Sequence, residues 1–242
     1  MKRTAVIMQP TYLPWAGYFD LMDQADVFVY LDTVQFARRS WQQRNRIMTA
    51  RGELMLTVPV LSKGLRDQTI RDVRVDPEQR GFWDSHIRSI ELAYSKATHG
   101  ADVVDLLSES FRRGHERLAD LTIDLIDRMA AVLELRPRTM RASDLSATGN
   151  KTQLLVAICQ HVGATEYLSP TGSHAYLDGD DSFASAGVDL RYHRYVPAEY
   201  PQVHDGAFVP YLSVVDLMAN VGFTRAREII REGRQLTGGT AQ

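Results

Sequence analysis

Short apolar runs alternate with amphipathic segments along this chain, and the alternation predicts parallel strands that are connected by helices. Thr4 to Met8 is apolar almost throughout, as expected for a strand that is buried on both faces. Trp15 to Gln24 has the spacing of a helix, and Asp26 to Asp32 is a second strand rich in β-branched and aromatic residues. A strand–helix–strand unit of this length makes its two strands parallel neighbours.

The same alternation continues to the end of the chain and predicts its fold class. Further strands are expected at 53–60, 69–75, 139–142, 165–168 and 188–195. Helices are expected at 82–96, 103–135, 151–162 and 211–232, with breaks near Gly114 and at 220–222. The pattern predicts an α/β, Rossmann-like fold: a mostly parallel sheet with helices on both faces and a helical insertion at about 82–136. We expect one domain over residues 1–232 and a flexible polar tail at 233–242.

Composition and charge exclude several classes of protein. The 242 residues carry a formal net charge of −2, so no overall basic field argues for nucleic acid as a partner. No apolar run reaches the ~18 residues of a membrane span. The start of the chain also lacks the pattern of a signal peptide, so a cytoplasmic location is expected. The single cysteine excludes an intrachain disulfide framework, and the seven histidines are scattered without ligand spacing, so no metal is expected.

The loop from Gln9 to Tyr18 is the first candidate site, because it follows a predicted strand at the carboxyl edge of the sheet. Ligands of open α/β sheets bind at this edge. We expect Gln9, Tyr12, Trp15 and Tyr18 to line a substrate pocket through their amide, hydroxyl and aromatic groups. The alternative is a packed corner of prolines and aromatic rings without a ligand.

Asp32 is the candidate catalytic residue, because it ends the second predicted strand beside the first. A carboxylate at this place can orient or deprotonate an acceptor amine or hydroxyl. The sequence therefore predicts that Asp32 faces the same pocket as Gln9. The alternative is a capping role in the turn that follows the strand.

A basic segment with one indole ring follows, and it predicts binding of an anion. Arg44 and Arg46 face the same side of an extended chain, so they can clamp a phosphate or carboxylate, with Trp41 and Asn45 beside them. The alternative is a solvated basic edge that makes surface ion pairs.

Two later segments add candidate ligand contacts. Lys151 and Thr152 stand where a helix begins, and a helix N-terminus favours an anion; simple N-capping is the alternative. The loop after the predicted strand 165–168 offers further substrate-binding residues, namely Ser169, Thr171, Gly172 and Tyr176. His174 lies in the same loop, where a lone histidine is more often a surface residue than a general base.

Cys159 is expected to be inert. Leu154, Leu155, Ile158, Cys159 and Val162 share one face of a predicted helix, so the thiol should be buried and without a catalytic role.

The chain resembles the WbqC-like protein family. The resemblance rests on three segments near the N-terminus, at 8–19, 28–36 and 41–47, and on later blocks at 154–159, 167–169, 200–202 and 208–220. It implies a bacterial protein, and it implies an association with surface-polysaccharide or natural-product biosynthesis. It supplies no reaction mechanism. A weaker similarity to the α/β half of nucleotidyltransferases supports a Rossmann-like sheet.

Together these observations favour a biosynthetic group transferase. We expect transfer of an acyl, aminoacyl or sugar-modifying group to or from a small molecule that carries a phosphate or carboxylate. An acyl- or aminoacyl-thioester is a candidate donor, and no cofactor is assigned. The alternatives are a ligand-binding or accessory protein without turnover and, third, a nucleotidyltransferase.

Overall fold

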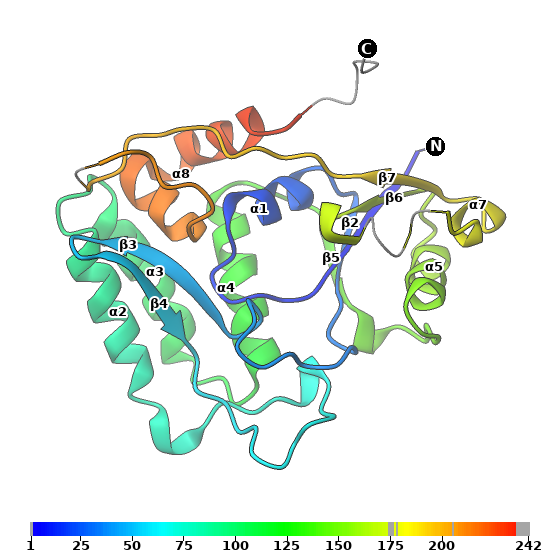
Figure 1. Ribbon diagram of the computed structural model, residues 1–242, viewed down its shortest axis with the longest axis horizontal. Helices are drawn as coiled ribbons and strands as arrows, with labels where there is room; N and C mark the ends of the chain where they lie inside the picture. Colours follow the sequence, from blue (N-terminus) through cyan, green and yellow to red (C-terminus); the bar gives the residue numbers. More distant parts are fainter. Residues whose placement is uncertain (1, 174–176, 178, 205, 236–242) are drawn as a thin grey trace.

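The computed structural model of the chain describes residues 2–173, 177, 179–204 and 206–235. Its centre is a sheet of five strands in the order β5-β2-β1-β6-β7, and all of its strand pairs are parallel (Figure 1). The strands are β1 (Thr4–Met8), β2 (Val27–Tyr30), β5 (Arg138–Arg141), β6 (Glu166–Ser169) and β7 (Asp189–Tyr192). The predicted parallel neighbours β1 and β2 pair directly, with Met8 opposite Tyr30.

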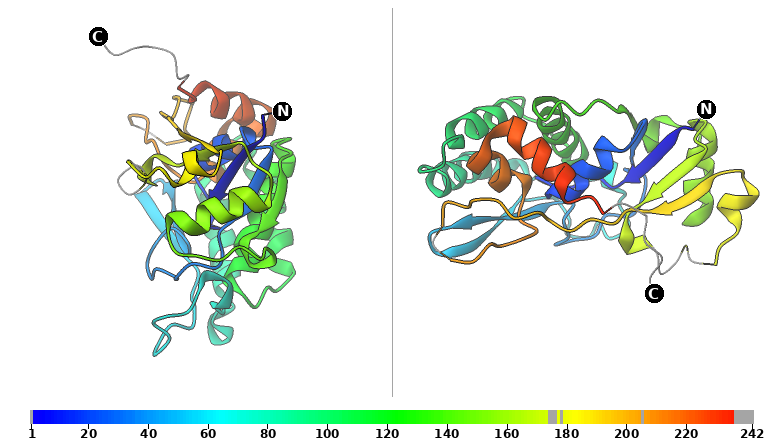
Figure 2. Two further views of the ribbon diagram at one scale, coloured as in Figure 1. Left: turned by 90° about the vertical axis from the view of Figure 1, so that its right-hand side faces the viewer. Right: turned by 90° about the horizontal axis from the view of Figure 1, so that it is seen from above.

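Helices cover both faces of the sheet because successive strand residues point to opposite sides. Val6 and Phe28 belong to one apolar core, and Ala5 and Val27 belong to another. The first core is formed with α1 (Ala16–Asp23), α4 (Leu118–Val132) and α8 (Val214–Glu232), and the second with α5 (Thr152–His161) and α7 (Ser182–Ser185). In Figure 2 α8 runs beside α1, and the two helices pack together. The predicted α/β, Rossmann-like fold is confirmed.

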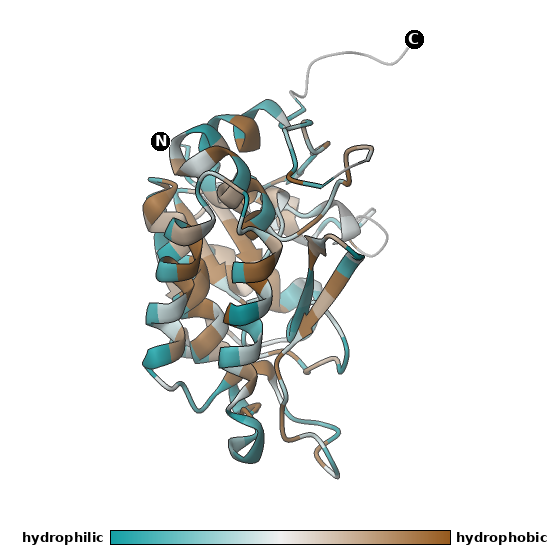
Figure 3. Ribbon diagram, turned by 90° about the vertical axis from the view of Figure 1, so that its left-hand side faces the viewer, coloured by the Kyte–Doolittle hydropathy of each residue, from teal (hydrophilic) through white to brown (hydrophobic). Residues whose placement is uncertain are grey.

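Three helices fill the stretch in which a helical insertion was expected. They are α2 (Phe82–Ala93), α3 (Gly100–Arg112) and α4; α3 packs against both of the others and also against α8. The predicted break near Gly114 is confirmed, since this glycine has a φ of +66° between α3 and α4. These helices carry separate polar and apolar faces, which alternate as teal and brown in Figure 3. Their apolar faces extend the first core away from the sheet.

A two-stranded hairpin stands apart from the parallel sheet. It consists of β3 (Arg44–Thr49) and β4 (Gly52–Thr57), which pair antiparallel. The strand expected at 69–75 is wrong: Ile70–Asp72 form a 3-10 turn, followed by isolated bridges. The buried residues Ile70 and Val73 are three apart, which suits a turn better than the two-residue period of a strand.

The C-terminal part of the chain is bound to α1. α8 has a kink at Gly222, whose φ is +78°, as the sequence predicts for 220–222. The guanidinium of Arg234 then donates hydrogen bonds to Asp20 and Asp23. The expected flexible tail is therefore held in place as far as this arginine, while 236–242 lie outside the described residues. None of the described helices combines the length and the apolar character that crossing a membrane requires.

Candidate functional site

A cleft of about 320 Å³ lies at the carboxyl end of β1, beside β3. We call it the aromatic cleft. It is lined by Met8, Thr11, Pro14, Trp15, Tyr18, Trp41, Asn45, Arg46 and Tyr211. Five of these residues, namely Trp15, Tyr18, Trp41, Asn45 and Arg46, are among those expected from the sequence to bind substrate. The structure thus brings residues of the loop after β1 and residues of the basic segment to one place.

Hydrogen bonds to the backbone of the loop after β1 hold this loop in the shape that forms the cleft. The Tyr12 N–H donates to the carbonyl of Trp41 at 2.9 Å, and the Asn45 side chain donates to the carbonyl of Leu13 at 2.8 Å. Leu13 has a positive φ of 45°, a conformation that L-residues rarely adopt and that these contacts stabilise. On the other side, the Val214 N–H donates to the carbonyl of Pro14 at 2.8 Å. These three hydrogen bonds therefore fix the shape of the loop that lines the cleft.

Aromatic rings form the walls of the cleft. The Trp15 ring contacts Tyr211, with 5.3 Å between the ring centroids, and meets Tyr195 edge-on. It lies over Gly17, where a Cβ atom would come within 2.3 Å of the indole. Trp41 is 52% exposed and Tyr211 is 49% exposed, so both rings offer apolar surface to a ligand.

Arg46 supplies the positive charge of the cleft. Its Nη1 donates to both carboxylate oxygens of Glu53, at 2.9 and 3.1 Å, which fixes the direction of the guanidinium. Its Nε atom is buried and has no partner among the residues that the structure describes. Arg44 lies two residues earlier on the same strand but does not line the cleft, so the expected pair of arginines is not assembled there.

Two of the residues expected in the pocket are engaged elsewhere. Tyr12 is fully buried, and its hydroxyl is bonded to Nδ1 of His86 at 2.8 Å. Gln9 is exposed, and its Oε1 accepts a hydrogen bond from Gln42 at 2.7 Å. Tyr18 does line the cleft, but its hydroxyl donates to the Gln9 carbonyl and burial raises its pKa well above 10, so it stays protonated.

Asp32 does not line the aromatic cleft. It is fully buried, and its two carboxylate oxygens accept hydrogen bonds from the N–H and the hydroxyl of Ser143, at 2.9 and 2.6 Å. It therefore holds the turn after β5 against the end of β2. This is the capping role that the sequence left as the alternative, and the geometry gives a catalytic role for Asp32 no support.

The remaining expected contacts lie around β6 and the start of α5. Ser169 ends β6, is fully buried, and its hydroxyl has no partner among the described residues. Gly172 is exposed, the side chain of Thr171 is not described, and Tyr176 and His174 lie outside the described residues. Lys151 is exposed before α5, and hydrogen bonds from Ser182 and Thr152 lower the pKa of Asp180. The Asp180 carboxylate thus contacts Thr152 at the helix start where the sequence predicted an anion.

The sequence did not single out the second polar cluster of the structure. Asp216 on α8 is buried and accepts hydrogen bonds from Tyr94, Tyr200 and Gln202 at the wall of a cavity of about 530 Å³. Tyr94 and Asp216 are 122 residues apart, so no local pattern could connect them. The only signal was that Tyr200, Gln202 and Asp216 fall within the blocks that carry the family resemblance.

Comparison with known proteins decides the family. The model of the WbqC-like protein family matches residues 9–228. The chain belongs to the WbqC-like protein family. The match includes every residue that lines the aromatic cleft except Met8. An uncharacterized protein of Mycobacterium tuberculosis, Rv1507c, is 34% identical over 237 residues, which cover 97% of this chain and all of that protein. No solved structure matches this WbqC-like protein significantly.

Proposed function

We propose that this WbqC-like protein is a biosynthetic group transferase whose aromatic cleft binds a small molecule that carries a phosphate or carboxylate. The observation that supports the proposal is the make-up of the cleft, in which Trp15, Trp41 and Tyr211 surround Arg46. Aromatic faces pack against flat or sugar rings, and a guanidinium binds phosphate or carboxylate through charge-assisted hydrogen bonds. A nucleotide sugar, a sugar phosphate or a coenzyme A thioester presents both features.

In this proposal Arg46 positions the anion of the substrate. Glu53 holds Nη1, so the guanidinium is fixed before the substrate arrives and loses little freedom on binding. Glu53 bonds to Nη1, and we assign the remaining N–H groups, on Nη2, to the substrate anion. We propose that the transferred group is acyl, aminoacyl or sugar-modifying, with an acyl- or aminoacyl-thioester as the candidate donor.

Binding without turnover is the second candidate function, and one observation favours it. The described residues that line the cleft include no histidine and no carboxylate, which are the usual general bases. An accessory protein that presents a ligand to a partner enzyme needs only the aromatic walls and the arginine. The two candidates differ in whether purified protein converts the ligand that it binds.

Calorimetric titration with nucleotides, coenzyme A and sugar phosphates tests the proposal. We expect at least one of these ligands to bind the wild-type protein, and Arg46→Ala to weaken that binding roughly ten- to a hundredfold. Arg46→Lys should also weaken it, because an ammonium lacks the planar fork of a guanidinium. Arg51→Ala is the matched control, because Arg51 is exposed nearby and does not line the cleft. Equal affinity of all four proteins would reject the proposed site.

Product analysis then separates the candidate functions. Consumption of a thioester or a sugar nucleotide supports the transferase, and tight binding without product supports the accessory role. Release of pyrophosphate from a nucleoside triphosphate would instead support nucleotidyl transfer.

A further inference from the structure

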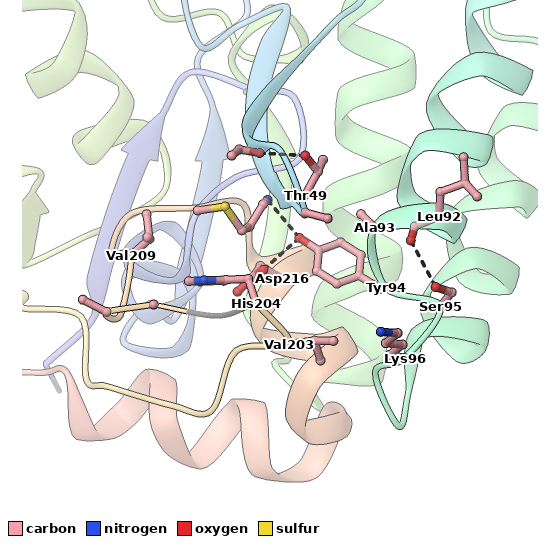
Figure 4. Close-up of a pocket in the computed structure, with 15 residues that line it drawn as sticks. Thr49, Leu92, Ala93, Tyr94, Ser95, Lys96, Val203, His204, Val209 and Asp216 are labelled. Carbon is pink, nitrogen blue, oxygen red and sulfur yellow. Dashed lines mark hydrogen bonds between the residues drawn. The ribbon is translucent and has the colours of Figure 1, made fainter.

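The Asp216 carboxylate accepts hydrogen bonds from three side chains, which come from two separate parts of the chain. It lies in the first turn of α8 and is 1% exposed. The Tyr94 hydroxyl donates to Oδ1 at 2.9 Å, while the Tyr200 hydroxyl and the Gln202 amide donate to Oδ2 at 2.8 and 2.9 Å. Figure 4 shows the carboxylate beside the Tyr94 ring at the wall of the cavity.

The orientation of these donors is fixed by further contacts. Gln202 Oε1 accepts hydrogen bonds from the Val209 N–H and from Nε2 of His204, both at 2.9 Å. The amide NH₂ group of Gln202 therefore has to face the carboxylate. The Tyr94 hydroxyl lies 3.4 Å from the N–H of Met48, which donates to it, so its own proton is directed to Asp216. The cluster is built to hold a negative charge at this place.

No cation among the described residues forms an ion pair with Asp216. The buried Asp20 pairs with His193 and Arg234, and the buried Glu166 pairs with Lys2 and Arg191. The three hydrogen-bond donors to Asp216 are neutral. Burial raises the pKa of Asp216, while these hydrogen bonds and the nearby imidazole of His204, which also lines the cavity, act to lower it. A buried carboxylate whose hydrogen-bond donors are neutral is costly to keep charged, and a cation that neutralises it is correspondingly stabilised.

The cavity beside Asp216 has a second source of negative potential. Leu92 to Lys96 line it, and α2 ends within this segment, at Ala93. The carboxyl end of a helix carries a partial negative charge from its unpaired carbonyl groups. In Figure 4 the Tyr94 ring lies between Asp216 on one side and Lys96 on the other. The ammonium of Lys96 is exposed, so its charge is available to an anionic group of a ligand rather than to Asp216.

We propose that this cavity binds the primary ammonium group of a small polar ligand, an amino sugar or an amino acid, with Asp216 as its counter-ion. The volume of about 530 Å³ is in the range of small-molecule sites. Oδ1 accepts one hydrogen bond from Tyr94, and a carboxylate oxygen can accept a second one, which we assign to the ligand. The site is separate from the aromatic cleft, and the two share none of their lining residues.

Titration of the whole protein with matched amines tests the proposal. The probes are D-glucosamine and glycinamide, with N-acetyl-D-glucosamine as the uncharged control for the sugar. We expect one or both amines to bind and the acetylated sugar not to bind. Amide NMR shifts on the wild type should change at cavity residues such as Met48 and Val209. Binding of glucosamine alone identifies an amino-sugar site, and binding of glycinamide identifies an amino-acid-like ligand.

Variants assign the effect to the carboxylate. Asp216→Asn should weaken amine binding roughly ten- to a hundredfold, because the charge-assisted contact is lost. Asp102→Asn, an exposed carboxylate outside the cavity, and Arg46→Ala in the aromatic cleft should bind the amine as the wild type does. Failure of both amines to bind, equal binding of N-acetylglucosamine, or shifts confined to other surfaces would overturn the proposal. The NMR result on the wild type decides the matter even where Asp216→Asn does not fold.

Discussion

The hydroxyl of Tyr12 lies 2.8 Å from Nδ1 of His86, and this bond connects the loop after β1 to α2. Both side chains are buried. Burial lowers the pKa of His86 to about 4 and raises the pKa of Tyr12, so at neutral pH an uncharged imidazole and an uncharged phenol share this hydrogen bond. The loop after β1 is thereby fixed to α2 through a hydrogen bond between two uncharged groups.

The first prediction concerns acid stability. An unfolded histidine titrates at a pKa of about 6.5, so below this pH the unfolded chain binds a proton that folded His86 does not. The free energy of unfolding is therefore not reduced by His86 above about pH 6.5. It falls as the pH drops toward 4, by up to about 3 kcal/mol from this residue. The free energy of unfolding, measured with urea across this pH range, should depend less steeply on pH for His86→Gln than for the wild type. An equally steep slope in both, with the exposed His161→Gln as control, would contradict the assignment.

The second prediction separates the structural and catalytic interpretations of Asp32. Asp32→Ala leaves the part-buried N–H and hydroxyl of Ser143 without their acceptors, so the free energy of unfolding should fall by about 2–3 kcal/mol. Asp32→Asn keeps one acceptor oxygen and should cost less. Ligand affinity at the aromatic cleft should be unchanged in the folded Asp32→Asn variant. A stable Asp32→Asn protein that binds ligand but has lost all turnover would restore the catalytic role.

The third prediction concerns Gly17. Alanine is a better helix former than glycine by about 1 kcal/mol, so by helix propensity alone Gly17→Ala should stabilise α1. Its Cβ atom would lie 2.3 Å from the Trp15 ring, however, so the indole has to move. We expect Gly17→Ala to fold, to shift the tryptophan fluorescence and to weaken ligand binding at the cleft. Gly81→Ala, at a position with open space around it, is the matched control. Unchanged binding in Gly17→Ala would mean that the indole position is not critical.

The fourth prediction concerns Cys159, whose expected burial is confirmed. Burial raises the pKa of the thiol to about 12, so almost no thiolate is present at neutral pH. Thiol reagents should label the native protein far more slowly than the unfolded protein. Cys159→Ala should cost about 1–2 kcal/mol through a small cavity and leave turnover intact. Rapid labelling together with an inactive, stable Cys159→Ser variant would point to covalent catalysis instead.

The sequence predicted those parts of the fold that depend on local pattern. The apolar runs at Thr4–Met8 and Val27–Tyr30 could only be strands buried on both faces, and a short helical crossover makes such strands parallel. The glycine at 222 marked the kink of α8, because a positive φ is easy for glycine alone. The same reasoning placed Trp15, in the loop that follows the first strand, near the carboxyl edge of the sheet.

Side-chain direction and long-range contacts were beyond such reasoning. Its position at a strand end does not reveal whether Asp32 faces solvent or a neighbouring turn. In the structure its carboxylate accepts a hydrogen bond from Ser143 in the turn after β5. Tyr12 could not be told from a pocket residue until α2 brought His86 against it. The Asp216 cluster depends on contacts between segments far apart in the chain, which no hydrophobic period encodes.

The loop after β1 is closed by the C-terminal third of the chain, and this sets the order in which the protein is completed during synthesis. Trp15 bridges to Ser213, whose N–H also bonds the carbonyl of Arg46. A ribosome adds roughly 5–20 residues per second, so the loop after β1 is synthesised within the first seconds. Nearly two hundred further residues must then be added before its last partner, Ser213, is present. Until Tyr211 is synthesised, the indole of Trp15 lacks this packing partner and the wall of the aromatic cleft is incomplete.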